Sequence, residues 1–121
     1  MDTHILLWVL EGSPRIQRVS HRLLDQDNRV YFSVASLWEI AIKSALGKLD
    51  ANVTEIREAA KSSGFEELPV LGIHVEWLPK LPLHHRDPFD RLLVAQAQSE
   101  PMQLITVDST VALYGANIEI V

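Results

Sequence analysis

Short apolar runs alternate with helix-like segments along this sequence, and this alternation limits the folds it can adopt. The runs Val30–Val34 and Leu104–Val107 are rich in β-branched or aromatic residues, which is typical of buried strands. Strands separated by helices predict parallel βαβ units and a layered α/β sheet. We expect strands over 30–34, 65–70, 104–107 and 118–121, and helices over 3–10, 14–24, 36–46, 53–63, 72–78 and 88–99.

The composition is that of one globular domain spanning residues 1–121. Of the 121 residues, 47% are hydrophobic and 22% are charged, which is enough apolar material for one core. The net charge of −5 excludes the uniformly basic surface of non-specific nucleic-acid binders. It allows a nucleic-acid enzyme, because bound metal ions change the local sign of charge.

The chain contains no cysteine, which excludes disulfides, thiolate zinc sites and thiol nucleophiles. No apolar run approaches the roughly 20 residues of a membrane span, and no secretory signal is visible. We therefore expect a cytoplasmic protein with no membrane partner.

Four acidic residues fall at or just after junctions between the expected elements. They are Asp2, Glu39, Asp90 and Asp108. Because ligands of parallel sheets bind beyond the carboxyl ends of the strands, Glu39 and Asp108 are expected to share one edge. Mg²⁺ prefers a few carboxylates, with waters and substrate phosphate completing its shell. Two such ions can activate water and stabilise both oxygens of an in-line phosphoryl displacement.

Each acid also has a structural explanation. Ser36 and Glu39 have the spacing of a capping box, in which Glu39 would accept the backbone N–H of Ser36. Glu39 is also placed to pair with Lys43 one turn later. Asp87 is a favoured type for a helix N-cap, and Asp90 would complement the helix dipole.

Asp90 is the acid for which a purely structural role is least satisfactory. Its helical neighbours Leu93, Val94 and Ala97 are all apolar. An acid at the end of an apolar face costs desolvation energy unless something binds it. A metal ion or a buried partner is therefore expected at Asp90.

The cluster His84, His85 and Asp87 offers a different chemistry. Neutral imidazoles and a carboxylate can bind Zn²⁺, which would make the protein a zinc hydrolase. Adjacent histidines in an extended segment point to opposite faces, so we favour a loop beside the active site. Neither a glycine-rich phosphate loop nor a Gly-x-Ser-x-Gly elbow occurs, so a metal-free hydrolase has no support.

Four segments occur in an order that matches a known family and cover nearly the whole chain. They are Asp2-Thr3-His4-x-Leu6-Leu7-Trp8, then Ser36-x-Trp38-Glu39-Ile40-x-Ile42-Lys43 with Gly47-Lys48-Leu49, then His85-x-Asp87-Pro88-Phe89-Asp90-Arg91-x-Leu93-x-Ala95-Gln96-Ala97, and finally Thr106-x-Asp108. These segments resemble the PIN-domain nucleases of the VapC toxin type. Each segment is weak evidence alone, whereas four in order are specific.

The resemblance implies a three-layer α/β/α fold around a parallel sheet and a Mg²⁺- or Mn²⁺-dependent endoribonuclease. The residues that match the family's catalytic and metal-binding acids are Asp2, Glu39, Asp90 and Asp108. The small polar residues that match supporting positions are Thr106, Ser36 and Thr3. Members usually act as the toxin of a toxin–antitoxin pair. They form homodimers and are silenced by a VapB-type antitoxin whose tail covers the acidic site.

The sequence departs from the family pattern at its start. Family members generally carry a short apolar strand before the first aspartate, and here only Met1 precedes Asp2. Because that strand normally lies in the middle of the sheet, its absence should leave N–H and C=O groups of neighbouring strands unpaired. The alternative function is therefore a catalytically impaired PIN-like binding or regulatory module.

Overall fold

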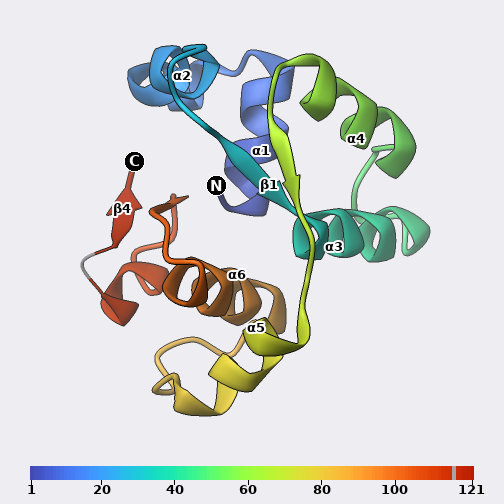
Figure 1. Cartoon of the computed structure of the whole chain (residues 1–121). Helices are drawn as coiled ribbons and strands as arrows, with labels where there is room; N and C mark the ends of the chain where they lie inside the picture. The colour runs from blue at the N-terminus through green and yellow to red at the C-terminus, as the bar shows by residue number, and fades with distance from the viewer. Residues whose placement is uncertain (116) are drawn as a thin grey trace.

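Helices and short strands alternate along the chain, as the sequence pattern predicts. A computed structural model describes residues 1–115 and 117–121 (Figure 1). The α-helices are α1 (Thr3–Glu11), α2 (Gln17–Leu24), α3 (Val34–Ala45), α4 (Val53–Ser62), α5 (Gly72–Trp77) and α6 (Pro88–Ser99). The strands are β1 (Tyr31–Ser33), β2 (Glu66–Leu68), β3 (Leu104–Thr106) and β4 (Ile118–Ile120), and the 3₁₀ turns are η1 (Pro14–Ile16), η2 (Leu78–Lys80) and η3 (Val111–Tyr114).

The strands pair in parallel, which confirms the predicted α/β fold class. Strand β1 pairs with β2, and Phe32 lies opposite Glu67. Strand β3 pairs with β4, and Ile105 lies opposite Glu119. Within the described residues, these are two separate two-stranded ladders rather than one continuous sheet.

The first two residues of the chain lie between the two ladders (Figure 1). The backbone N–H of Asp2 donates to the carbonyl of Ile105 at 2.9 Å. The amino group of Met1 lies 3.5 Å from the carbonyl of Tyr31. The segment that enters α1 is thus hydrogen-bonded to both β1 and β3.

Each ladder has its own hydrophobic core. Phe32 of β1 packs with Leu6 of α1 and Ile40 of α3 in one buried cluster. Leu104 of β3 packs with Val94 of α6 in the other. Ile5 and Leu6 of α1 belong to the first cluster. Asp2 and Thr3, at the entry to α1, are also buried. Among the described residues, no helix is both long and apolar enough to cross a membrane.

The start of α3 differs from the sequence expectation. We predicted a helix from Ser36, but α3 begins at Val34 because the hydroxyl of Ser33 accepts the N–H of Ala35 at 3.0 Å and caps the helix. The earlier start places Glu39 in the second turn of α3 rather than in the first. By contrast, α6 begins at Pro88 with Asp87 as its N-cap, as predicted.

Candidate metal centre

Asp2 is buried where the chain enters α1, and both of its carboxylate oxygens accept hydrogen bonds. One oxygen caps the helix by accepting the N–H of Ile5 at 2.9 Å. The other accepts the Thr106 hydroxyl at 2.6 Å and the Val107 N–H at 3.1 Å. Asp2 therefore joins the start of α1 to the carboxyl end of β3, and its orientation is fixed from both sides.

Thr106 connects Asp2 to Asp108. Its side chain is fully buried, and its hydroxyl donates to Asp2 while it accepts the N–H of Asp108 at 3.0 Å. One Asp108 oxygen accepts the N–H of Thr110 at 2.8 Å, so the turn after β3 orients this carboxylate. The predicted supporting role of Thr106 has a physical basis in these bonds.

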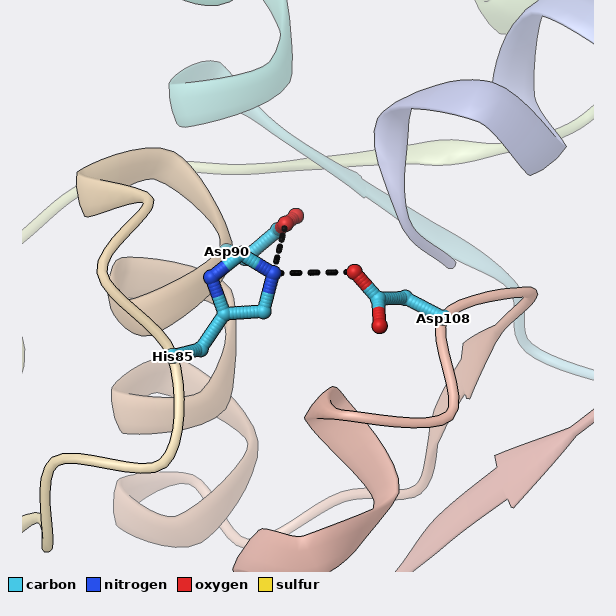
Figure 2. Close-up of side chains that lie close together, drawn as sticks. All are labelled: His85, Asp90 and Asp108. Atoms are coloured by element: carbon cyan, nitrogen blue, oxygen red, sulfur yellow. Dashed lines mark hydrogen bonds and ion pairs between the residues drawn. The ribbon is translucent and has the colours of Figure 1, made fainter.

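His85 lies between Asp90 and Asp108 (Figure 2). Its Nε2 atom is 2.8 Å from an oxygen of Asp108 and 3.3 Å from an oxygen of Asp90. One ligand atom from each of the three residues lies within 4.8 Å of the others. Asp90 comes from the first turn of α6, His85 from the loop before α6, and Asp108 from the turn after β3.

The hydrogen bonds of His85 define which ring nitrogen carries the proton. Nδ1 accepts the backbone N–H of Asp87 at 2.9 Å. In a neutral imidazole the other nitrogen then carries the proton, so Nε2–H donates to Asp108, while an oxygen of Asp90 lies 3.3 Å from the same nitrogen. His85 in this arrangement is a hydrogen-bond donor to Asp108, and the carboxylate oxygens of Asp90 and Asp108 are the acceptor atoms of the cluster that could hold a metal ion.

Asp90 has the most perturbed carboxyl group of the site. The pKa of Asp90 is raised to about 7, and burial is the largest cause of this shift. The charge of Asp87 raises the pKa further, and Glu39 and Asp2 make smaller contributions in the same direction. His85 acts in the opposite direction and lowers it. Glu39 and Asp2 thus lie near enough to repel a negative charge on Asp90. A bound cation would relieve this repulsion.

The pKa of Asp108 shifts in the opposite direction to that of Asp90. Partial burial acts to raise the pKa of Asp108, but hydrogen bonds from His85 and from the Thr110 backbone outweigh it. The net effect lowers the pKa of Asp108 below its ordinary value. At neutral pH the site therefore combines an ionised Asp108 with an Asp90 that is only partly ionised.

Glu39 brings a buried carboxylate from α3. Its side chain is 5% exposed, and one oxygen forms the predicted pair with Lys43 at 2.5 Å. The other oxygen, Oε1, has no hydrogen-bond partner among the described residues. The predicted capping box is wrong, because Ser36 lies within α3 and Glu39 is left without that role. A buried carboxylate oxygen without a partner is costly unless a ligand binds it.

The remaining two predicted residues, Thr3 and Ser36, contact each other. The hydroxyl of Thr3 donates to that of Ser36 at 3.0 Å, and both side chains are buried. This bond ties the first turn of α1 to the first turn of α3. It links the helix that follows Asp2 to the helix that carries Glu39.

The donor set fits a hard divalent cation. Carboxylate oxygens are the ligands that Mg²⁺ and Mn²⁺ prefer, and Glu39 Oε1 is a buried oxygen without a partner. The zinc cluster considered from the sequence is not assembled. The ring of His84 packs edge-on against the ring of Tyr114, with 5.0 Å between the ring centroids. The carboxylate of Asp87 instead caps α6.

His85 is the site residue that our selection of acids missed. The available signal was its position two residues before Asp87, which placed it in a loop beside the active site. Its contact with Asp108, 23 residues further along the chain, depends on how α6 packs beside β3.

Comparison with known proteins identifies one family. A model of the PIN domain family matches residues 1–116 of the chain. The search of curated proteins found no matching relative. No solved structure matches the chain either.

Proposed function

The chain belongs to the PIN domain family, and from this membership we propose that it is a metal-dependent endoribonuclease. PIN domains are typically nucleases that use divalent metal ions, so a hydrolytic nuclease is the general function of this fold. The finer assignments belong to our proposal: RNA is the substrate, cleavage is internal, and the ion is Mg²⁺ or Mn²⁺.

The observation that carries the proposal is the unpartnered Oε1 atom of buried Glu39, in a cluster where Asp90 is crowded by other acids. Without a cation, this arrangement places carboxylates together at an energetic cost. A divalent cation turns the same arrangement into a binding site, because each carboxylate then has a positive partner.

The roles of the residues follow from their contacts. When bound, a divalent cation would supply the charge that activates water and stabilises the phosphate during in-line displacement. Asp90, Asp108 and Glu39 would hold it, and Asp2 would add a fourth carboxylate whose orientation Thr106 fixes. The Nε2–H of His85 donates to Asp108 and lies beside an oxygen of Asp90.

Lys43 is a cation beside this cluster that could contact the substrate. Its amino group bonds Glu39, yet 40% of its side chain remains exposed. It can therefore offer a charged hydrogen-bond donor to an RNA phosphate while it stays close to the acids.

We also infer that the protein is the toxin of a toxin–antitoxin pair, with a homodimer and a VapB-type antitoxin as partners. The resemblance described above motivates this inference. An exposed apolar stripe on α3 supports a protein partner: Trp38, Ile42 and Leu46 recur every four residues and are 56%, 37% and 63% exposed. The stripe lies on the helix that carries Glu39, so a partner bound there would also be close to the acids.

The test is RNA cleavage by the purified chain with Mg²⁺, with Mn²⁺ and with excess EDTA. We expect cleavage with either ion and none with EDTA. Asp90→Asn and Asp108→Asn should each abolish most of the activity, while Asp50→Asn, an exposed aspartate outside the cluster, should retain it. Far-UV circular dichroism on every variant verifies that the comparison is between folded proteins.

Two results would contradict the proposal. One is cleavage by folded Asp90→Asn and Asp108→Asn at the wild-type rate, which would exclude these acids from the chemistry. The other is a folded wild-type chain that shows no Mg²⁺ or Mn²⁺ binding by calorimetry, which would favour a binding or regulatory module.

A further inference from the structure

Gln96 is a buried polar residue in the second half of α6, and the proposed chemistry does not use it. Only 1% of the residue is exposed, and its neighbours Ala95 and Ala97 are buried and apolar. An apolar side chain would fill this place without the cost of removing an amide from water. The amide is therefore tolerated here only if hydrogen bonds satisfy its oxygen and its nitrogen.

Both ends of the Gln96 amide have partners. Its oxygen, Oε1, accepts the hydroxyl of Ser33 at 2.5 Å. Its nitrogen, Nε2, donates to the carbonyl of Pro69 at 3.2 Å and lies 3.4 Å from Nδ1 of buried His74. Because a carbonyl can only accept, the nitrogen must face Pro69, and the oxygen then faces Ser33. Gln96 thus joins α6 to the end of β1 and to the segment after β2.

Ser33 carries this contact into α3. It is the last residue of β1 and the N-cap of α3, where its hydroxyl accepts the N–H of Ala35 at 3.0 Å. The same hydroxyl donates to Gln96, so one oxygen takes part both in the cap and in the contact with α6. A satisfied buried polar network of this kind selects one arrangement of the elements that it joins. The start of α3 is therefore held at one position along α6.

Helices α3 and α6 contact each other again at Trp38 and Phe89. The two rings meet edge-on, with 4.9 Å between their centroids. Trp38 follows Ser33 along the chain, whereas Phe89 precedes Gln96, so the two helices run in opposite directions along their contact. Each ring belongs to the residue just before one of the site's acids, so this second contact lies beside the carboxylates.

The two acids lie at matching intervals from the bond between Ser33 and Gln96. Glu39 is six positions after Ser33, and Asp90 is six positions before Gln96. At 1.5 Å of rise per residue, each interval is about 9 Å of helix. Because the helices run in opposite directions, equal intervals bring Glu39 and Asp90 to the same level, and the influence of Glu39 on the pKa of Asp90, which it raises, agrees with this proximity.

A small displacement of these helices would disturb the site. If α3 moved along α6 by one residue, the level of Glu39 relative to Asp90 would change by about 1.5 Å. Ligands of a functional site must be held within about 0.5 Å of their productive geometry. The bond that fixes the register of α3 against α6 therefore also controls whether these two carboxylates can share a cation.

We propose that Gln96 is a positioning residue of the metal centre: through Ser33 it fixes the register of α3 against α6, and this register sets the separation of Glu39 and Asp90. The inference rests on the proposed metal-dependent function. Gln96 acts on the ion only through the helices that carry the two acids. Loss of its bond to Ser33 should weaken metal binding while the apolar core around α6 keeps the chain folded.

The direct test compares two identical substitutions in α6. Gln96→Met keeps the length of the side chain and removes the bond to Ser33. Gln98→Met is the matched control, because the Gln98 side chain donates to the carbonyl of Tyr114 at 3.2 Å and not to α3. Mn²⁺ binding is titrated by electron paramagnetic resonance on samples shown to be folded by circular dichroism. We expect the Kd for Mn²⁺ to rise about tenfold in Gln96→Met and to stay unchanged in Gln98→Met.

A second readout reports the helix register without metal or RNA. Nuclear Overhauser effects between the rings of Trp38 and Phe89 detect whether these residues still meet. We expect these effects in metal-free wild type and in Gln98→Met, and we expect them to weaken or vanish in Gln96→Met. A purely local role of Gln96 in the core would leave them unchanged.

Ser33→Ala removes the same hydrogen bond from the other side. If Gln96 acts through Ser33, the double variant should bind Mn²⁺ no more weakly than the weaker-binding of the two single variants. Losses that add up independently in the double variant would overturn the proposed route. Ser33→Ala also carries the test if Gln96→Met does not fold, because an unchanged Kd in folded Ser33→Ala would equally contradict the proposal.

The outcomes separate this inference from the proposed function. A folded wild-type chain that binds no Mn²⁺ would contradict the metal-dependent function itself, and with it a positioning role. Mn²⁺ binding by the wild type that is equally tight in folded Gln96→Met would overturn only the role of Gln96. A tenfold weaker affinity together with loss of the contact between the rings of Trp38 and Phe89 would support it.

Discussion

Replacement of Asp90 by asparagine is expected to stabilise the metal-free protein above neutral pH. Burial and the neighbouring acid Asp87, with smaller effects from Glu39 and Asp2, raise the pKa of Asp90 from 3.8 to about 7. The folded state therefore binds more protons than the unfolded state between about pH 4 and pH 7. Stability falls as pH rises through this window, and the full penalty is present above pH 7. Asparagine has nearly the same shape and carries no charge, so it avoids the penalty.

The magnitude follows from the size of the shift. The difference between 3.8 and about 7 corresponds to about 4 kcal/mol at 1.36 kcal/mol per pKa unit. The Asp90 side chain is 23% exposed, so solvent screening reduces this figure. The variant also loses the favourable interaction of a carboxylate with the N-terminus of α6, worth about 0.5 kcal/mol. We expect a net gain of about 2 to 3 kcal/mol at pH 8 and close to none at pH 4.

Urea denaturation in EDTA at pH 8 and at pH 4 measures this difference, with Asp50→Asn as a control for the loss of one negative charge. Addition of Mn²⁺ at pH 8 should stabilise the wild type and have little effect on Asp90→Asn, because the cation offsets the same penalty. Equal stability of wild type and Asp90→Asn at pH 8 in EDTA would refute the reasoning. A gain of the same size at both pH values would show that the effect is not electrostatic.

Three further predictions concern single contacts. Thr106→Val keeps the shape of the side chain but removes the donor to Asp2 and the acceptor for the Asp108 N–H. We therefore expect the free energy of unfolding, measured by urea denaturation, to fall by about 1 to 3 kcal/mol. An unchanged urea midpoint would show that these two hydrogen bonds do not stabilise the fold. Asp87→Ala should cost about 1 kcal/mol as a lost N-cap of α6, with Asp50→Ala as the neutral comparison. His85→Ala should raise the pKa of Asp108, since the side-chain hydrogen bond from His85 that lowers this pKa is removed. Carboxyl carbon NMR titration measures that shift, and a lower pKa in the variant would contradict it.

The start of each helix shows how far local sequence was sufficient. Asp87 followed by Pro88 predicted the N-terminus of α6, and the structure confirms it because both preferences act within one turn of chain. Ser36 was assigned as the start of α3, whereas Ser33 performs the capping. Both serines have the same capping chemistry, and the choice depends on where β1 ends against β2, which is a tertiary contact.

The candidate site shows the same division. The positions of Asp2 and Asp108 beside predicted elements were visible in the sequence, and the structure joins them through Thr106. The position of His85 between Asp90 and Asp108 could not be predicted from the sequence, because it requires the loop before α6 to meet the turn after β3. No periodicity or short motif reports a contact across that distance.

The sequence by itself determined the alternation of strands and helices, and hence the α/β class, because hydrophobic periodicity and capping act over a few neighbouring residues. It also placed the acids at the ends of these elements. Only the tertiary structure decided that the parallel strands form two ladders on either side of Met1, and that Asp90 has a pKa of about 7. Burial and charge repulsion depend on distances in space between residues far apart in the chain, so these properties arise only when the chain has folded.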